Sequence, residues 1–333
     1  MNRSIAWRLI CASLVAALTA AAAGAQSVPS QSAPARQSPQ DLVDALHSAF
    51  GEHHARAVHA KGILLEGSFT PAKDARALSR EAVFAGATLP VVVRFSDFTG
   101  IPDIPDTVGD ANPRGFAIKF KAPGGDVDLV THSFNGFPVA TSDEFAVFLR
   151  AIGASGAGVA HPTPIEQFLD RNPIAKKFVT SQPPPPESYA TAAYFGVNSF
   201  KFTNSSGKSV FARYRLVPRA GEHYLSAATL AEKGPNYLLE EIRRRVTTTP
   251  VVFDWYAQIS GPGDKIGDPS LAWPESRKLV PLGTITITRV ADTPDLDRQT
   301  LFLPGTIHRG IAPADPMLTL RNNAYPLSFR KRH

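Results

Sequence analysis

The stretch RGFAIKFKAPGGDVDLVTH, residues 114–132, contains two short apolar segments separated by a turn signal. Each segment alternates in part between apolar and polar residues, as a half-buried strand does. The intervening APGGD supplies the proline and glycines of a tight connection. This pattern predicts two antiparallel strands, at 114–121 and 126–132, and LPVVVRFSDF at 89–98 predicts another strand just before them.

Further strands are expected downstream, with helices inserted between them. NSSG lies between NSFKFT and KSVFARYRLV and is typical of a hairpin. VVFDWYAQI (251–259) and LGTITITRV (282–290) are also strand-like. Helical spacing of apolar residues predicts helices at 40–50, 141–152 and 236–246. We therefore expect an α+β fold, an antiparallel β-barrel with inserted and C-terminal helices.

The first 25 residues resemble an export signal. A short charged start with Arg3 and Arg8 precedes an alanine-rich apolar run, and small residues at 23–25 end it. This pattern predicts a signal peptide over residues 1–25, cleaved before Gln26. We expect the mature protein to be periplasmic or secreted, without a stable membrane anchor, because the apolar run is short.

The rest of the chain is expected to form one domain, at 41–333, preceded by a flexible Ser-, Gln- and Pro-rich arm at 26–40. Cys11, the single cysteine, lies in the predicted signal peptide. Its removal excludes disulfides, thiolate metal sites and a cysteine nucleophile. Loss of the signal lowers the formal charge from +6 to +4, which is too dilute to predict nucleic-acid binding.

The C-terminal segment LRNNAYPLSFRKRH (320–333) places two arginines and a tyrosine on one helical face. Arg321, Tyr325 and Arg332 have the spacing i, i+4 and i+11. Asp315 and Pro316 have the chemistry of an N-cap and a first helical residue. Taken alone, the pattern also fits a solvated basic helix with a half-buried tyrosine.

Two upstream segments combine histidine, arginine and serine. Arg56 and His59 lie at i and i+3 in ARAVHAKG, and Arg94 and Ser96 share one face of the strand predicted at 89–98. Each is ordinary by itself, because a lone histidine is usually structural and such an arginine usually points outward. Phosphate-binding, nucleophile-elbow and zinc-protease motifs do not occur in the sequence. His53, His54 and His59 are close in the sequence. A zinc site at these histidines is disfavoured, since no carboxylate lies at a familiar ligand spacing from them.

The order of these segments resembles that of the haem catalases, most closely the short bacterial catalase-related peroxidases. The resemblance extends over most of the mature chain. It is carried by RAVHAKG, VVVRFSDFTG, DTVGDANPRGFAIKFKAPGGDVDLV, FGVNSFKFTNSSGKSVFARYRLVP and RNNAYP…R. It implies a catalase-like barrel whose helices help to enclose a haem, which we expect to be haem b.

The resemblance implies that Tyr325 ligates the haem iron and that Arg321 stabilises its phenolate. Free tyrosine has a pKa of about 10, so keeping it ionised at pH 7 requires roughly 4 kcal/mol. Ferric iron and a neighbouring guanidinium can supply this. Arg56, Arg94 and Arg332 match the family's propionate-binding arginines, and arginine pairs well with carboxylates.

On the opposite haem face, the resemblance makes His59 the catalytic histidine and Ser96 the residue that orients it. Phe145 falls where a phenyl ring packs over the porphyrin, although a core role explains it equally well. His132 stands where the family has a peroxide-binding asparagine, and Asn135 is the nearest asparagine. Either His132 takes over as donor, or Asn135 shifts in, or His132 is structural.

The expected function is reduction of hydrogen peroxide, and of organic peroxides, by a small organic reductant. The departure at His132 and an end only eight residues after Tyr325 favour peroxidase over catalase activity. We expect a monomer or small homo-oligomer. A true catalase is the near alternative. A non-catalytic haem-binding protein is the distant one, and His59 and Ser96 argue against it because a carrier needs neither.

Overall fold

The structure, a computed structural model, describes residues 36–291 and 295–333. The predicted signal peptide at 1–25 and most of the predicted arm at 26–40 lie outside the described residues. The first described helix, α1 (Pro39–Phe50), begins after Ser38, whose side chain accepts a hydrogen bond from the backbone N–H of Asp41. This capped start agrees with the helix predicted at 40–50.

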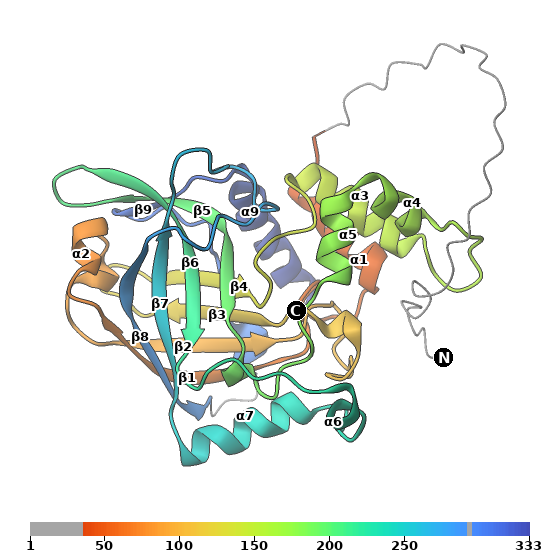
Figure 1. Cartoon of the computed structure of the whole chain (residues 1–333), viewed down its shortest axis with the longest axis horizontal. Helices are drawn as coiled ribbons and strands as arrows, with labels where there is room; N and C mark the ends of the chain where they lie inside the picture. The colour runs from red at the N-terminus through yellow and green to blue at the C-terminus, as the bar shows by residue number, and fades with distance from the viewer. Residues whose placement is uncertain (1–35, 292–294) are drawn as a thin grey trace, which may run out of the picture.

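A closed antiparallel barrel forms the centre of the molecule (Figure 1). Its strands follow the spatial order β4-β3-β2-β1-β8-β7-β6-β5, and a pairing between β4 and β5 closes the ring. A ninth strand, β9, pairs with β5 outside the ring. The bounds are β1 Gly62–Pro71, β2 Leu89–Ser96, β3 Gly115–Phe120, β4 Val127–His132, β5 Tyr194–Thr203, β6 Ser209–Pro218, β7 Val251–Ile259, β8 Leu279–Val290 and β9 Ile311–Pro313. The predicted barrel is confirmed.

One barrel strand was not predicted. β1 lies between β2 and β8, so the ring would be open without it. Its sequence GILLEGSFTP starts with an apolar run, and the residues after that run do not alternate regularly between apolar and polar. The register against β8 also shifts between Glu66 and Gly67. A bulge of this kind breaks the period of two on which strand prediction depends.

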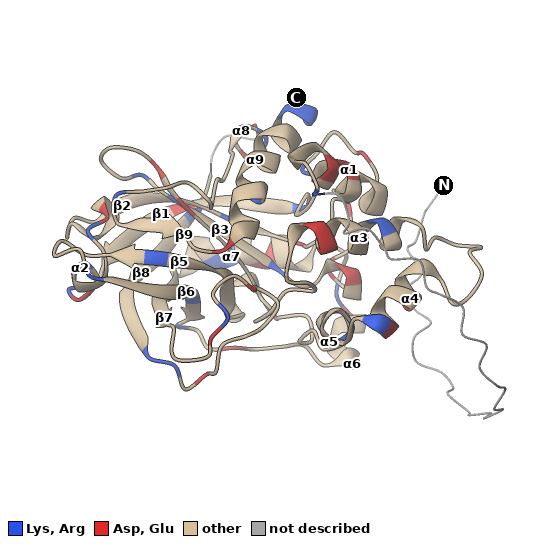
Figure 2. Cartoon of the chain, turned by 90° about the horizontal axis from the view of Figure 1, so that it is seen from above, with Lys and Arg blue, Asp and Glu red and all other residues tan. Residues whose placement is uncertain are grey.

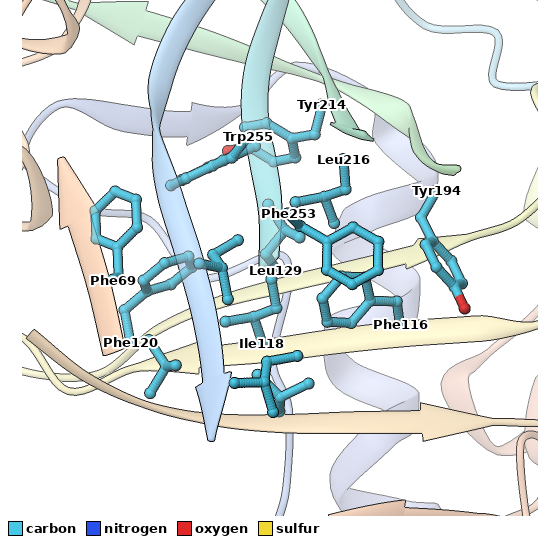
Figure 3. Packing of buried hydrophobic residues seen from close by; sticks show 14 of the residues in the cluster. Phe69, Phe116, Ile118, Phe120, Leu129, Tyr194, Tyr214, Leu216, Phe253 and Trp255 are labelled. Carbon is cyan, nitrogen blue, oxygen red and sulfur yellow. The ribbon is translucent and has the colours of Figure 1, made fainter. Parts of the chain in front are cut away.

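Aromatic side chains fill the barrel interior (Figure 3). Phe120 stacks on Trp255 with ring centroids 5.0 Å apart, and Phe69 meets Phe120 edge to face at 4.9 Å. Each fully buried aromatic side chain contributes about 1.5–3 kcal/mol of hydrophobic stabilisation. The barrel is therefore a packed core, and functional groups have to lie at its rim or outside its wall.

The helices gather mainly at one side of the barrel. In Figure 1, α9 lies between the barrel and a group formed by α1, α3, α4 and α5, and α9 packs directly on α1. Apolar residues of α1, α3, α4, α5 and α9 form a second core there. The remaining helices are α2 Ala75–Leu78, α3 Ser142–Gly153, α4 Pro164–Arg171, α5 Pro173–Thr180, α6 Ala227–Ala231, α7 Tyr237–Thr248, α8 Leu296–Gln299 and α9 Pro316–Lys331, with 3-10 turns at Ala82–Phe84, Gly109–Ala111 and Tyr189–Thr191.

The predicted helix starts are confirmed where they were capped by side chains. Thr141 and Glu144 form a reciprocal capping box at the start of α3. Asp315 accepts a hydrogen bond from the backbone N–H of Met317 at 2.9 Å, so α9 begins at Pro316 as expected. Local cap chemistry thus fixes where the helix carrying Tyr325 begins.

Charged residues are interspersed over barrel and helices (Figure 2). On α7, Arg245 pairs with Glu241 at 2.7 Å, as their i, i+4 spacing predicts. Within residues 36–291 and 295–333, every helix is too short or too polar to cross a lipid bilayer.

Candidate active site

Strand register brings distant residues into one row at an end of the barrel. Ser96 of β2 is opposite Gly115 of β3, and Gly115 is opposite His132 of β4. Gly62 of β1 and Phe195 of β5 extend the row on either side. Neighbouring strands are about 4.8 Å apart, so Ser96 and His132 lie roughly 10 Å from each other across the sheet.

His59 reaches this row from the loop before β1. Its Nδ1 is 3.0 Å from Ser96 Oγ. Gly115 leaves room for the ring, because a Cβ there would come 2.7 Å from His59 Nδ1. The structure therefore places His59 and Ser96 together as expected, and adds Gly115 as a residue whose small size the arrangement requires.

The backbone of His59 is held in an uncommon conformation. Its φ is 57°, in the left-handed region that residues other than glycine seldom adopt. The N–H groups of His59 and Ala60 donate to the carbonyls of Phe98 and Thr99, both at 2.9 Å. Arg94 Nη1 donates to the carbonyl of His59 at 2.8 Å. Such a conformation persists only where its surroundings enforce it.

The protein keeps His59 neutral. Although the residue is partly exposed, loss of water around the ring, followed by His132 and Arg94, lowers its pKa from 6.5 to about 3. A neutral imidazole can accept a proton. Because the folded-state pKa is depressed, the fold loses stability as the pH falls from 6.5 towards 3, where the unfolded chain takes up the proton first.

His132 has one ring nitrogen without a partner. Its Nδ1 accepts from the N–H of Phe134 at 3.3 Å, and its buried Nε2 has no hydrogen-bond partner among the described residues. Burial, with a smaller effect of Arg321, lowers the pKa of His132 to about 3. A neutral ring that accepts at Nδ1 carries its proton on Nε2. His132 therefore presents an unused donor, whereas no hydrogen bond within the described ranges joins Asn135 to His59 or Ser96.

On α9, Arg321 and Tyr325 meet as their spacing predicts. Arg321 Nη2 donates to Tyr325 Oη at 2.6 Å, and its Nη1 donates to Asn198 Oδ1 at 2.5 Å. Asn198 in turn donates to Asp315 Oδ2 at 2.7 Å. The chain of bonds ties the tyrosine to β5 and to the cap of its own helix. Asn198 was missed by sequence reasoning, and its signal was a polar residue within an apolar strand.

The three arginines expected to hold propionates lie around one short segment. Arg56 Nη2 and Arg332 Nη2 both donate to the carbonyl of Thr300, at 2.9 and 2.8 Å. Arg94 and Arg56 both donate to the carboxylate of Asp297. Arg332 Nε is buried and has no partner among the described residues.

Electrostatics shows that this arginine group carries unbalanced positive charge. Burial, with the neighbouring Arg94, lowers the pKa of Arg56 to about 9. Burial likewise lowers the pKa of Arg332 to about 10, although Asp297 opposes the shift. Both remain charged at neutral pH, so a further anionic group would be bound favourably here.

Phe145 belongs to the second apolar core. Its ring centroid is 4.8 Å from that of Phe137 and 6.3 Å from that of Phe148. Val58, Phe98 and Phe145 pack against the buried residues of this core, which include Ala324 beside Tyr325. Phe145 thus serves the packing of α3, and its position also fits a wall for a planar apolar ligand.

These groups fit a ferric haem. A guanidinium donor on the phenol oxygen favours an anionic iron ligand, and the arginines with an orphaned N–H suit propionates. Apolar side chains suit the macrocycle, and the free His132 donor suits a polar ligand on the iron. In the parts of the chain that the structure describes, no three His, Cys, Asp or Glu side chains gather to hold a metal ion without such a cofactor.

Comparisons with known proteins agree with this assembly. A family model described as Catalase matches residues 41–333. A catalase-related peroxidase from Mycolicibacterium paratuberculosis (strain ATCC BAA-968 / K-10) is 35% identical over 89% of this chain and 95% of its own length. A catalase-related peroxidase from Synechococcus elongatus (strain ATCC 33912 / PCC 7942 / FACHB-805) is 32% identical over 89% of this chain and 88% of its own length.

Solved structures show the same fold. Catalase A from Saccharomyces cerevisiae superimposes with a TM-score of 0.73 at 20% identity, covering 84% of this chain and 61% of that chain. A fungal catalase gives a TM-score of 0.73 at 21% identity, covering 93% of this chain and 66% of that chain.

Proposed function

The chain belongs to the catalase family, and we propose that it is a haem-dependent peroxidase that reduces hydrogen peroxide with an organic electron donor. The observation that carries this is the 2.6 Å bond from Arg321 Nη2 to Tyr325 Oη. An N–H donor fixed on the phenol oxygen stabilises the phenolate, which is the form that ligates ferric iron.

Bound haem, which we propose to be haem b, would supply the redox chemistry of the iron. Tyr325 is its proposed ligand. Among the described residues, Arg56 donates only through Nη2 and Arg332 Nε has no partner, so both arginines have N–H groups left for its propionates. Arg94 offers least, because it already donates to Asp297 and to the carbonyls of His59 and Ala60. Phe145 is proposed to contact the porphyrin.

The protein's part in peroxide cleavage is a proton transfer. His59 Nε2 takes the proton from the inner peroxide oxygen and delivers it to the outer oxygen, which leaves as water. Ser96 keeps the ring in place through Nδ1, and His132 Nε2–H donates to the bound peroxide. Neutral His59 starts in the form that this transfer requires.

The near alternative is a catalase, which oxidises a second peroxide to oxygen. Both relatives named above are called peroxidases. In addition, His132 stands where the resemblance to the family implies a peroxide-binding asparagine. The test is an absorption spectrum of the purified protein with and without peroxide, together with oxygen and reductant measurements. We expect a haem spectrum that peroxide changes, with oxidation of an added phenolic reductant exceeding oxygen release. Oxygen release without reductant at the higher rate would favour the catalase instead. A haem spectrum that peroxide leaves unchanged would favour a carrier.

Replacing His132 with Asn tests the choice of reaction. The substitution restores the family's usual residue and removes the orphaned Nε2–H donor. We expect the ratio of oxygen release to reductant oxidation to rise several-fold, measured with an oxygen electrode and a phenolic dye at equal haem content. An unchanged ratio would mean that His132 does not act on the peroxide. His161→Asn, at an exposed histidine paired with Glu166, is the matched control.

We also propose export, with cleavage before Gln26, and a monomer or small homo-oligomer in the periplasm or medium. The support for export is the sequence pattern of residues 1–25. N-terminal sequencing of protein recovered from the periplasm or medium is expected to begin at or next to Gln26. Exported protein that begins at Met1 would contradict the proposed cleavage.

A further inference from the structure

Asp297 on α8 joins two of the site's arginines. Its Oδ1 accepts from Arg94 Nε at 2.6 Å and from Arg56 Nη2 at 2.9 Å, and its Oδ2 accepts from Arg94 Nη2 at 3.1 Å. Arg94 thus meets the carboxylate through two adjacent N–H groups, a bidentate arrangement that fixes the guanidinium plane. The side chain of Arg94 is 3% exposed, so its orientation depends on these internal partners.

The two terminal nitrogens of the Arg94 guanidinium also hold the backbone at the proposed catalytic histidine. Arg94 Nη1 donates to the carbonyl of His59 at 2.8 Å, and Nη2 donates to that of Ala60 at 3.0 Å. Gly62 makes this approach possible, since a Cβ there would lie 2.7 Å from Arg94 Cζ. Four of the five N–H groups of Arg94 are therefore engaged, two by Asp297 and two by these carbonyls.

His59 needs this support because of its left-handed backbone, with φ at 57°. The Ser96 contact fixes only the ring, through Nδ1. Arg94 holds the backbone carbonyl of His59 by a hydrogen bond, and Asp297 holds the guanidinium of Arg94. A precise proton-transfer group requires a supporting shell of this kind.

Asp297 also balances charge. Among the described residues, its carboxylate forms ion pairs with both Arg56 and Arg94. Its negative charge offsets the repulsion between these two arginines. Burial alone would raise the pKa of Asp297, but Arg94 and Arg56 outweigh burial and hold it well below its usual value. The carboxylate is thus ionised throughout the neutral range.

We propose that Asp297 is a positioning residue, which holds Arg94 and thereby the backbone of His59 in the geometry that proton transfer requires. The catalytic consequence rests on the proposed function, whereas the structural coupling does not. Asp297 is 203 residues from Arg94 in the sequence, so the coupling links the loop before β1 to the segment between β8 and α9.

The test compares Asp297→Asn with Asp254→Asn. Asp254 also pairs with an arginine, Arg219, at 2.8 Å, and its side chain is 28% exposed against 33% for Asp297, but it lies on β7. Amide hydrogen exchange is measured on the protein as purified, at the N–H groups of His59 and Ala60, which donate to Phe98 and Thr99. We expect exchange at these two amides to accelerate about tenfold or more in Asp297→Asn only.

A second readout connects the coupling to chemistry. At equal haem content, Asp297→Asn is expected to lower kcat for peroxide reduction about tenfold with little change in KM for the organic reductant, and Asp297→Glu to recover part of the loss. Unchanged exchange at both amides, or acceleration spread equally over the barrel strands, would overturn the proposal. If the parent protein lacks peroxide turnover, the proposed function fails, while the exchange experiment still decides whether Asp297 holds His59.

Discussion

Replacing Tyr325 with phenylalanine is expected to lower peroxide reduction by about 100-fold or more, with the protein still folded. The substitution removes one oxygen, so the ring keeps its packing beside Ala324, while the 2.6 Å bond from Arg321 is lost. Iron would then lack the anionic ligand that stabilises its oxidised forms. The measurements are the ferric absorption spectrum, which should change, and initial rates at equal haem content.

Two further variants make this result specific. Arg321→Leu is expected to act in the same direction but more mildly, because it removes the donor that stabilises the phenolate while leaving the phenol. Tyr224→Phe is the matched control. Tyr224 Oη also makes a hydrogen bond, to Glu222 Oε2 at 2.7 Å, and neither residue belongs to the proposed site. A native spectrum and full activity in Tyr325→Phe would mean that α9 is only a basic helix.

The barrel was predictable because most of its strands carry local signals. The segments at 114–121 and 126–132 alternate in part between apolar and polar residues and are separated by a turn. The helix with Tyr325 was predictable for a similar reason, since Asp315 and Pro316 mark its start. Such signals act within a few residues, where backbone geometry and periodicity decide structure.

Two short helices that the sequence analysis does not predict also carry local signals. α4 and α5 are eight residues each, and α4 begins with the reciprocal cap of Thr163 and Glu166 followed by Pro164 at the first helical position. Each of these helices contributes one buried residue to the second apolar core, Leu169 from α4 and Ala175 from α5. β1 was missed for the opposite reason, because a bulge disturbs its alternation.

Which residues the supporting side chains of the site contact could not be predicted from the sequence. Asn198 is 123 residues from Arg321, and Asp297 is 203 residues from Arg94. Each is an ordinary polar residue until barrel closure brings it to an arginine. The sequence also could not say that Arg94 faces a protein carboxylate, because partner choice depends on the tertiary structure.

Replacing His59 is expected to slow peroxide cleavage by about 10²–10⁴-fold, the usual contribution of a general acid–base group. His59→Asn is preferable to His59→Ala for this test. Asparagine tolerates the left-handed backbone, where φ is 57°, better than alanine does, so the loop before β1 should keep its course. Stopped-flow spectra of the haem after mixing with peroxide measure the step directly.

The rate loss in a Ser96 variant then distinguishes a role in orienting His59 from the proton transfer by His59 itself. Ser96→Ala keeps the imidazole but removes the 3.0 Å contact with Nδ1, so a smaller loss is expected than with His59→Asn. Haem content should stay close to that of the parent in both variants, because Tyr325 and the arginines that surround Thr300 are untouched. If His59→Asn reacts with peroxide at the parent rate, His59 is a structural residue. The neutral imidazole, the strained backbone and the Arg94 contact would then serve the fold of the loop rather than proton transfer.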